Sequence, residues 1–173
     1  MTLKGVIIQG SSRSNGNTNK VVSFVQKETG FDIIDLASKQ IGGFDYNFKN
    51  KNDDFLPLME EIVHRYDIII FATPVYWYSM SGIMKNFFDR ITDCLKIEKE
   101  IGKKLREKAM GMISCGSDSK LKKGFEMPFV ESANYLGMHY LGDIHTWIEN
   151  GKISESLKKD LHIFIQKKIK NGS

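Results

Sequence analysis

Short apolar runs alternate with amphipathic segments along most of this chain, and no other feature of the sequence constrains the fold as strongly. The short runs predict strands, and the amphipathic segments carry apolar residues at helical spacing. Strands that alternate with helices form βαβ units, whose strands are parallel. The predicted strands are residues 3–9, 31–36, 67–73, 109–115 and 138–148, and the predicted helices are residues 17–28, 55–65, 80–95, 124–136 and 154–170.

These elements predict an α/β fold in which helices cover both faces of a five-stranded parallel sheet. Residues 67–73 (DIIIFAT) form the most continuously apolar strand, so we expect that strand at the centre, where both of its faces are buried. A length of 173 residues matches one domain of ordinary size. We therefore expect residues 1–173 to form a single domain.

The charge and the cysteines of the chain exclude several classes of protein. Its 25 basic and 21 acidic residues give a net charge of +4, well short of a dedicated nucleic-acid binder. The two cysteines, Cys94 and Cys115, form no C-x-x-C pair, which argues against a disulfide framework and for a reducing compartment. No stretch reaches the ~18 apolar residues of a membrane span. We expect a cytoplasmic protein with no nucleic-acid partner and no membrane partner.

The first polar loop follows the first predicted strand and leads directly into a helix. Hydroxyl and amide side chains can donate hydrogen bonds to an anion there, Arg13 adds a positive charge, and the helix N-terminus offers unpaired N–H groups. This hydroxyl-rich loop, residues 10–19, therefore predicts a phosphate site, although it could alternatively serve only as a turn and a helix cap. Its candidate cofactor-binding residues are Ser11, Ser12, Arg13, Ser14, Asn17, Thr18 and Asn19.

Other phosphate-binding loops do not match this spacing. A nucleoside-triphosphate P-loop needs four residues between its glycines and then a lysine, whereas five residues separate Gly10 from Gly16 and Asn17 follows. A dinucleotide-binding G-x-G-x-x-G motif is also absent from the loop. The loop has neither the cysteine of a phosphatase nor the acidic residues of a receiver domain.

An aromatic loop, residues 74–79, follows the third predicted strand. Three consecutive aromatic residues at the carboxyl end of a strand would suit a planar ligand such as a flavin isoalloxazine, although the rings could instead fill the core or a subunit interface. A third polar loop, the glycine–serine loop of residues 116–119, follows the fourth strand. The candidate cofactor-binding residues of these two loops are Pro74, Val75, Tyr76, Trp77, Tyr78, Ser79, Gly116 and Ser117.

Together, the two main motifs resemble those of the flavodoxin-like NADPH-dependent FMN reductases, a family with quinone-, azo- and chromate-reducing members. The hydroxyl-rich loop is similar to the phosphate loop of that family, and Pro74, Val75 and Tyr76 before Gly82 are similar to its isoalloxazine loop. The resemblance implies a three-layer sandwich with strand order 2-1-3-4-5, a bound FMN, and NADPH or NADH as electron donor.

Two segments, GSSRSNGNT and KNFFDR, are especially similar to the iron–sulfur flavoprotein branch of this family. That branch carries a cysteine cluster after its second strand. The corresponding loop here, residues 37–54, contains no cysteine, so we expect no iron–sulfur cluster. Loops of this length are usually functional or mobile, and the sequence leaves open whether this one is a lid, an interface segment or disordered.

The implied activity is a two-electron transfer from NADPH or NADH to a quinone-like or other small aromatic acceptor. Since the flavin carries this chemistry, we name no catalytic acid or base, and we expect Tyr76 and Trp77 to wall the acceptor pocket. A one-electron carrier and a non-catalytic FMN-binding module are the alternatives. The four histidines show no metal-ligand spacing, so no metal is expected and we interpret them as surface or packing residues.

The exposed loops also bear on assembly. An open sheet edge offers little cover for a flat ring, and residues 37–54 and 76–78 carry more aromatic surface than a monomer needs to expose. We therefore expect a homodimer or homotetramer with the cofactor near a subunit boundary.

Overall fold

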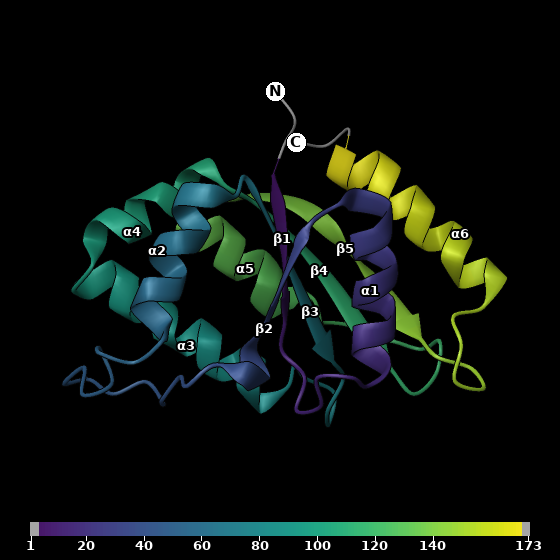
Figure 1. The fold of residues 1–173 in the computed structure, drawn as a ribbon, viewed down its shortest axis with the longest axis horizontal. Coiled ribbons are helices and arrows are strands. Elements are labelled where there is room, and N and C mark those ends of the chain that lie inside the picture. Colours follow the sequence, from purple (N-terminus) through teal and green to yellow (C-terminus); the bar gives the residue numbers. More distant parts are fainter. Residues whose placement is uncertain (1–3, 171–173) are drawn as a thin grey trace.

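The computed structural model describes residues 4–170 and shows helices on both faces of a five-stranded sheet (Figure 1). The strands are β1 (Gly5–Gln9), β2 (Asp32–Asp35), β3 (Ile68–Pro74), β4 (Ala109–Gly116) and β5 (His139–Trp147). The helices are α1 (Asn17–Thr29), α2 (Phe55–Arg65), α3 (Gly82–Lys96), α4 (Lys99–Lys104), α5 (Met127–Leu136) and α6 (Glu155–Phe164), with a π-helical turn at Ile165–Lys170.

The strand order is β2-β1-β3-β4-β5, and every neighbouring pair is parallel. This confirms the flavodoxin-like fold and the expected order. All seven residues of β3 are buried, and β3 lies between β1 and β4 at the centre of the sheet, as its continuous apolar run predicts.

Two hydrophobic cores hold the three layers together. On one face of the sheet, α2, α3 and α5 bury Phe55, Phe87 and Phe129 against the strands. On the other face, α1 and α6 bury residues such as Val22 and Leu161. Figure 1 shows α1 and α6 on the opposite side of the sheet from the other helices.

Some boundaries differ from those predicted from the sequence. Residue 3 of the first predicted strand lies outside the described residues, and Leu36 begins a 3₁₀ turn instead of ending β2. The helix predicted from residue 124 begins at Met127, because Gly124 adopts a left-handed conformation with φ of 91°. Helix α4 was not predicted, since its six residues, KEIGKK, are mostly charged and too short to show a period.

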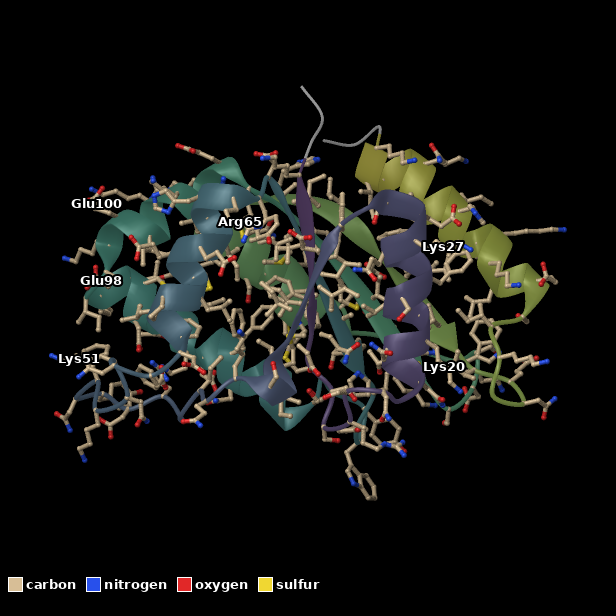
Figure 2. The ribbon with its side chains drawn as sticks, in the orientation of Figure 1. Lys20, Lys27, Lys51, Arg65, Glu98 and Glu100 are labelled. Atoms are coloured by element: carbon tan, nitrogen blue, oxygen red, sulfur yellow. The ribbon has the colours of Figure 1, made fainter. Side chains whose placement is uncertain are left out.

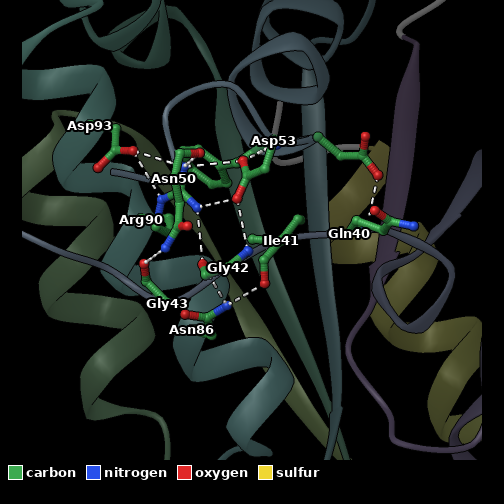
Figure 3. A network of polar contacts seen from close by, with 11 residues as sticks. Gln40, Ile41, Gly42, Gly43, Asn50, Asp53, Asn86, Arg90 and Asp93 are labelled. Carbon is green, nitrogen blue, oxygen red and sulfur yellow. Dashed lines mark hydrogen bonds and ion pairs between the residues drawn. The ribbon is translucent and has the colours of Figure 1, made fainter. Parts of the chain in front are cut away.

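The long segment between β2 and α2 follows a defined path because a buried arginine of α3 holds it (Figure 3). The guanidinium of Arg90, only 1% exposed, donates to the carboxylate of Asp53 at 2.6 Å, to the Gly42 carbonyl at 2.9 Å and to the Asn50 carbonyl at 3.1 Å. Arg90 also bonds Asp93 within α3 at 2.9 Å. The loop is thus attached to α3 at several points.

The carboxyl group of Asp53 reflects this environment. Burial alone would raise its pKa, but hydrogen bonds from Arg90 and from the backbone N–H groups of Phe55 and Gly42 outweigh burial and lower the pKa below its usual value. Asp53 is therefore held ionised beside Arg90. Among residues 4–170, no helix is long and apolar enough to cross a membrane.

Candidate functional site

The three loops predicted as a site meet at the carboxyl edge of the sheet, because β1, β3 and β4 are neighbours there. Backbone hydrogen bonds between neighbouring strands continue into the first residues of the loops. The Gly10 N–H donates to the Ala72 carbonyl at 2.8 Å, and the Val75 N–H donates to the Cys115 carbonyl at 2.9 Å. A further hydrogen bond of 3.0 Å joins the Ser12 and Tyr76 hydroxyls. The hydroxyl-rich loop and the aromatic loop are therefore in direct contact.

The hydroxyl-rich loop presents donors at the start of α1. The residue before the helix, Gly16, has no side chain with which to cap the first turn. Ser11 and Thr18 are buried beneath the loop, whereas Ser12, Arg13 and Asn17 are exposed. The Arg13 guanidinium has no ion-pair partner among residues 4–170, so its charge is available to an anion.

A buried glutamine holds the same loop in shape. Gln9, fully buried at the end of β1, donates to the Ser14 carbonyl at 3.0 Å and accepts from the Asn19 side chain at 3.1 Å. Gln9 was not among the residues predicted for the site, although a polar residue at the end of an apolar strand was a signal that its side chain turns toward the loop.

The aromatic loop is a tight and strained hairpin. Tyr76 and Ser79 exchange backbone hydrogen bonds of 2.9 and 3.1 Å, which leaves Trp77 and Tyr78 as the two turn residues. Both have positive φ, 47° and 65°, a conformation that such turns normally give to glycine or asparagine. Trp77 is 93% exposed and Tyr78 is 66% exposed. Strained backbone that presents large rings to solvent is typical of a ligand site.

The start of α3 joins the aromatic loop to the hydroxyl-rich loop. The buried hydroxyl of Ser81 donates to the Gly10 carbonyl at 2.5 Å and accepts from the Met84 N–H at 3.1 Å, which caps the helix. A Cβ atom on Gly10 would lie 2.8 Å from the Met84 side chain, so only glycine permits this close approach. Ser81 was not among the residues predicted for the site either.

A cavity of about 210 Å³ lies where the aromatic loop meets the glycine–serine loop. Val75 and Tyr78 line it from the aromatic loop, Gly116 and Ser117 from the glycine–serine loop, and His145 from β5. Cys115, the last residue before this loop, is only 5% exposed, and burial raises the pKa of its thiol despite hydrogen bonds with Thr146 and Thr18. The cysteine is therefore an inert buried residue.

Several larger cavities lie elsewhere on the molecule. One of about 630 Å³ is bordered by residues 51–53, α2 and α4, and another of about 300 Å³ lies between α3 and α5. None of the residues of the three loops lines either cavity. We place the site at the carboxyl edge because its donors, rather than its volume, match a ligand with a phosphate and a planar ring.

The residues of this edge fit FMN in both of its parts. The uncapped start of α1, the loop hydroxyls and the free charge of Arg13 form a donor set for a phosphate. At the other end, Gly116 lets the His145 ring lie directly against the backbone, since a Cβ atom there would be 2.8 Å from that ring. The cavity between Tyr78 and Gly116 is the place at this edge that a planar ring would enter.

Comparison with known proteins supports the same assignment. Residues 3–152 match the family described as NADPH-dependent FMN reductase. YwqN of Bacillus subtilis (strain 168), which carries the name NAD(P)H-dependent FMN-containing oxidoreductase, is 29% identical over 153 residues, 81% of this chain and 80% of its own. An FMN-dependent NADPH-azoreductase of Staphylococcus haemolyticus is 30% identical over 98 residues, 51% of this chain and 52% of its own.

Solved structures share the fold over nearly the whole chain. The Trp repressor binding protein from Bacillus subtilis superposes with a TM-score of 0.74 at 24% identity, covering 95% of this chain and 97% of that one. An FMN-dependent NADH-azoreductase from Bacillus anthracis in complex with FMN superposes with a TM-score of 0.65 at 11% identity, covering 98% and 100%. The family match extends over most of the sequence and confirms the expected resemblance: the chain belongs to the NADPH-dependent FMN reductase family and is an FMN-dependent enzyme of that class.

Proposed function

We propose that this enzyme holds FMN at the carboxyl edge of the sheet and passes two electrons from NADPH or NADH to a quinone-like or other small aromatic acceptor. The observation that carries this proposal is the contact between a phosphate-type loop and a strained, exposed aromatic hairpin through Ser12 and Tyr76. A phosphate and a planar ring of one ligand would be bound side by side there.

Different residues of the site would bind the two ends of FMN, the phosphate and the ring. Ser11, Arg13 and Thr18, with the first N–H groups of α1, would hold the phosphate. Tyr76 and Tyr78 would flank the ring on one side, and the backbone at Gly116 and Ser117 would lie along its other side. When bound there, FMN would supply the two-electron redox chemistry that links the nicotinamide to the acceptor.

The acceptor would bind beside the exposed indole. Trp77 is 93% exposed and buries little surface within its own chain, which favours a role as a wall for a second planar molecule that replaces the spent nicotinamide. A quinone that gains the two electrons takes up two protons, of which one derives from the hydride and one from water. No side chain needs to act as a general acid in this exchange.

We further propose that the enzyme is a cytoplasmic homodimer or homotetramer. Figure 1 shows the segment between β2 and α2 running along the same lower edge as the β1–α1 and β3–α3 loops. Tyr46 on that segment is 88% exposed, and Trp77 on the aromatic loop is 93% exposed. A second copy that covers both would shield the flavin ring from water.

The function is tested by steady-state turnover. The full chain is saturated with FMN, and the oxidation of NADPH and of NADH is followed with a panel of quinones, nitroaromatics and azo dyes, with free FMN as the control. We expect saturable oxidation with at least one class of acceptor, at one nicotinamide per quinone. Rates no higher than those of free FMN with every acceptor would instead favour a one-electron carrier or a non-catalytic FMN-binding module.

A further inference from the structure

One histidine lies at the candidate flavin cavity although its place in the sequence gave no such signal. His145 is in β5, opposite Ser114 in β4, and its ring lines the cavity between the aromatic and glycine–serine loops. Both ring nitrogens have partners: Nδ1 lies 2.8 Å from the Ser114 hydroxyl, and Nε2 lies 3.0 Å from the Asp118 carbonyl oxygen.

These two partners determine the protonation pattern of the neutral ring. A carbonyl oxygen only accepts hydrogen bonds, so Nε2 must carry the proton that it donates to Asp118. The neutral Nδ1 then accepts from the Ser114 hydroxyl. The imidazole is therefore held as the Nε2–H tautomer, with its plane oriented by both bonds.

The same ring spans the end of β4. Ser114 lies two residues before Gly116, the last residue of the strand, and Asp118 lies two residues after it. The ring also lies directly against the backbone between them, because a Cβ atom on Gly116 would be 2.8 Å from Cε1 and 3.1 Å from Nε2 of His145. His145 thus contacts the strand, its last residue and the loop that follows.

We propose that His145 is a positioning residue that fixes the glycine–serine loop at the distance from Tyr78 that a flavin ring requires. It acts through the Asp118 carbonyl rather than by reacting with the ligand. This inference rests on the proposed function, since it takes the cavity between Tyr78 and Gly116 as the place of the isoalloxazine.

His145 and Arg13 would act on different ends of the cofactor. His145 holds the ring end, whereas Arg13 faces the phosphate end. Loss of the histidine should therefore weaken FMN and riboflavin, which lacks the phosphate, by the same factor. Loss of Arg13 should weaken FMN alone.

The test compares His145→Leu with His145→Gln, whose side-chain amide can still donate to the Asp118 carbonyl. His139→Leu is the matched control, because His139 lies at the opposite end of the same strand and is exposed. Dissociation constants for FMN and riboflavin are measured by fluorescence titration, and folding is checked by circular dichroism. We expect His145→Leu to weaken both flavins roughly 3- to 10-fold, the range for one lost hydrogen bond, and His145→Gln to restore most of the affinity.

A measurement on the unsubstituted protein keeps the proposal falsifiable if His145→Leu does not fold. Long-range proton–nitrogen NMR at a pH where the ring is neutral should show the Nε2–H tautomer for His145, and Ser114→Ala should weaken both flavins to a smaller extent. An Nδ1–H tautomer, a loss confined to FMN, or affinities for His145→Leu equal to those of His139→Leu would overturn the proposal. If the unsubstituted chain bound neither flavin, the proposed function would fail as well. If the unsubstituted chain bound both flavins and His145→Leu left both affinities unchanged, only this inference would be rejected.

Discussion

At the scale of single residues, the candidate site contains backbone strain that side-chain packing within the chain does not offset. Trp77 and Tyr78 occupy left-handed backbone, at a cost of roughly 1–2 kcal/mol for a residue other than glycine, while their rings lie mostly in solvent. Side chains kept in such a position contribute more to a ligand than to the fold.

Replacing the strained tryptophan should separate stability from function. Relative to Trp77→Ala, the variant Trp77→Gly should have a free energy of unfolding higher by about 1 kcal/mol, because glycine adopts positive φ without strain. Both variants should raise the acceptor KM more than the FMN dissociation constant. Urea denaturation and steady-state kinetics check these expectations, and unchanged kinetics with several acceptors would show that Trp77 does not wall the acceptor site.

Arg13 should act on the phosphate end of the cofactor. We expect Arg13→Ala to weaken FMN binding by about 1.5–3 kcal/mol, the range for hydrogen bonds to a charged group, and to leave riboflavin binding unchanged. Lys27→Ala is the matched control, since it removes the same charge at the far end of α1 (Figure 2). Equal losses for FMN and riboflavin would mean that Arg13 does not contact the phosphate.

At the scale of elements, the Arg90 network decides the path of residues 37–54. Arg90 and Asp53 lie 37 residues apart, and both are largely removed from solvent. Removing one partner of a buried pair leaves the other charge without compensation and typically costs about 3–5 kcal/mol. The loop and α3 should therefore lose stability together when the pair is broken.

The ionised state of Asp53 should make this stability depend on pH. Its pKa in the folded chain is below the ordinary value of 3.8, so its contribution is complete above that value and is lost as the pH falls through the folded-state pKa. We expect Asp53→Asn to be less stable than the parent near neutral pH, with a difference that shrinks below pH 3.8. Urea denaturation at several pH values measures this, with Asp45→Asn, a half-buried carboxylate of the same loop that pairs with Lys49 instead of Arg90, as control. A difference that stays constant with pH would contradict it.

The sequence predicted those elements whose signal is local. Apolar periodicity located the strands and the longer helices, and it identified β3 as the central strand. The path of residues 37–54 could not be predicted, because it depends on Arg90 in a distant helix. His145 was missed for a similar reason: only the pairing of β4 with β5 brings it to Ser114, which lies 31 residues earlier in the chain. Contacts of this kind have no local pattern.

At the scale of the whole molecule, the arrangement of the loops predicts an assembly. Sedimentation at micromolar concentration should give the mass of a dimer or a tetramer rather than the 19.8 kDa of one chain. Tyr46→Lys replaces an aromatic ring that is 88% exposed in the single chain with a charged side chain. The substitution should shift the enzyme toward the monomer if the Tyr46 ring is buried between copies. Asn52→Lys, which adds the same single positive charge at an exposed residue of the same loop, is the control for the charge change alone. A monomer that retains FMN and full quinone reduction would show that one chain completes the site.

The central claim is that one FMN binds at the carboxyl edge of the sheet, with its phosphate at the hydroxyl-rich loop. Equilibrium titration of the purified full chain with FMN, followed by flavin absorbance, tests this most directly, in parallel with Gly116→Leu, whose side chain would collide with the His145 ring and displace it at the cavity. We predict saturation at one FMN per chain for the parent protein and a severe loss of affinity for the variant. Circular dichroism should show that the variant retains the fold. Absence of saturable binding by the parent, or equal binding by Gly116→Leu, would contradict the account.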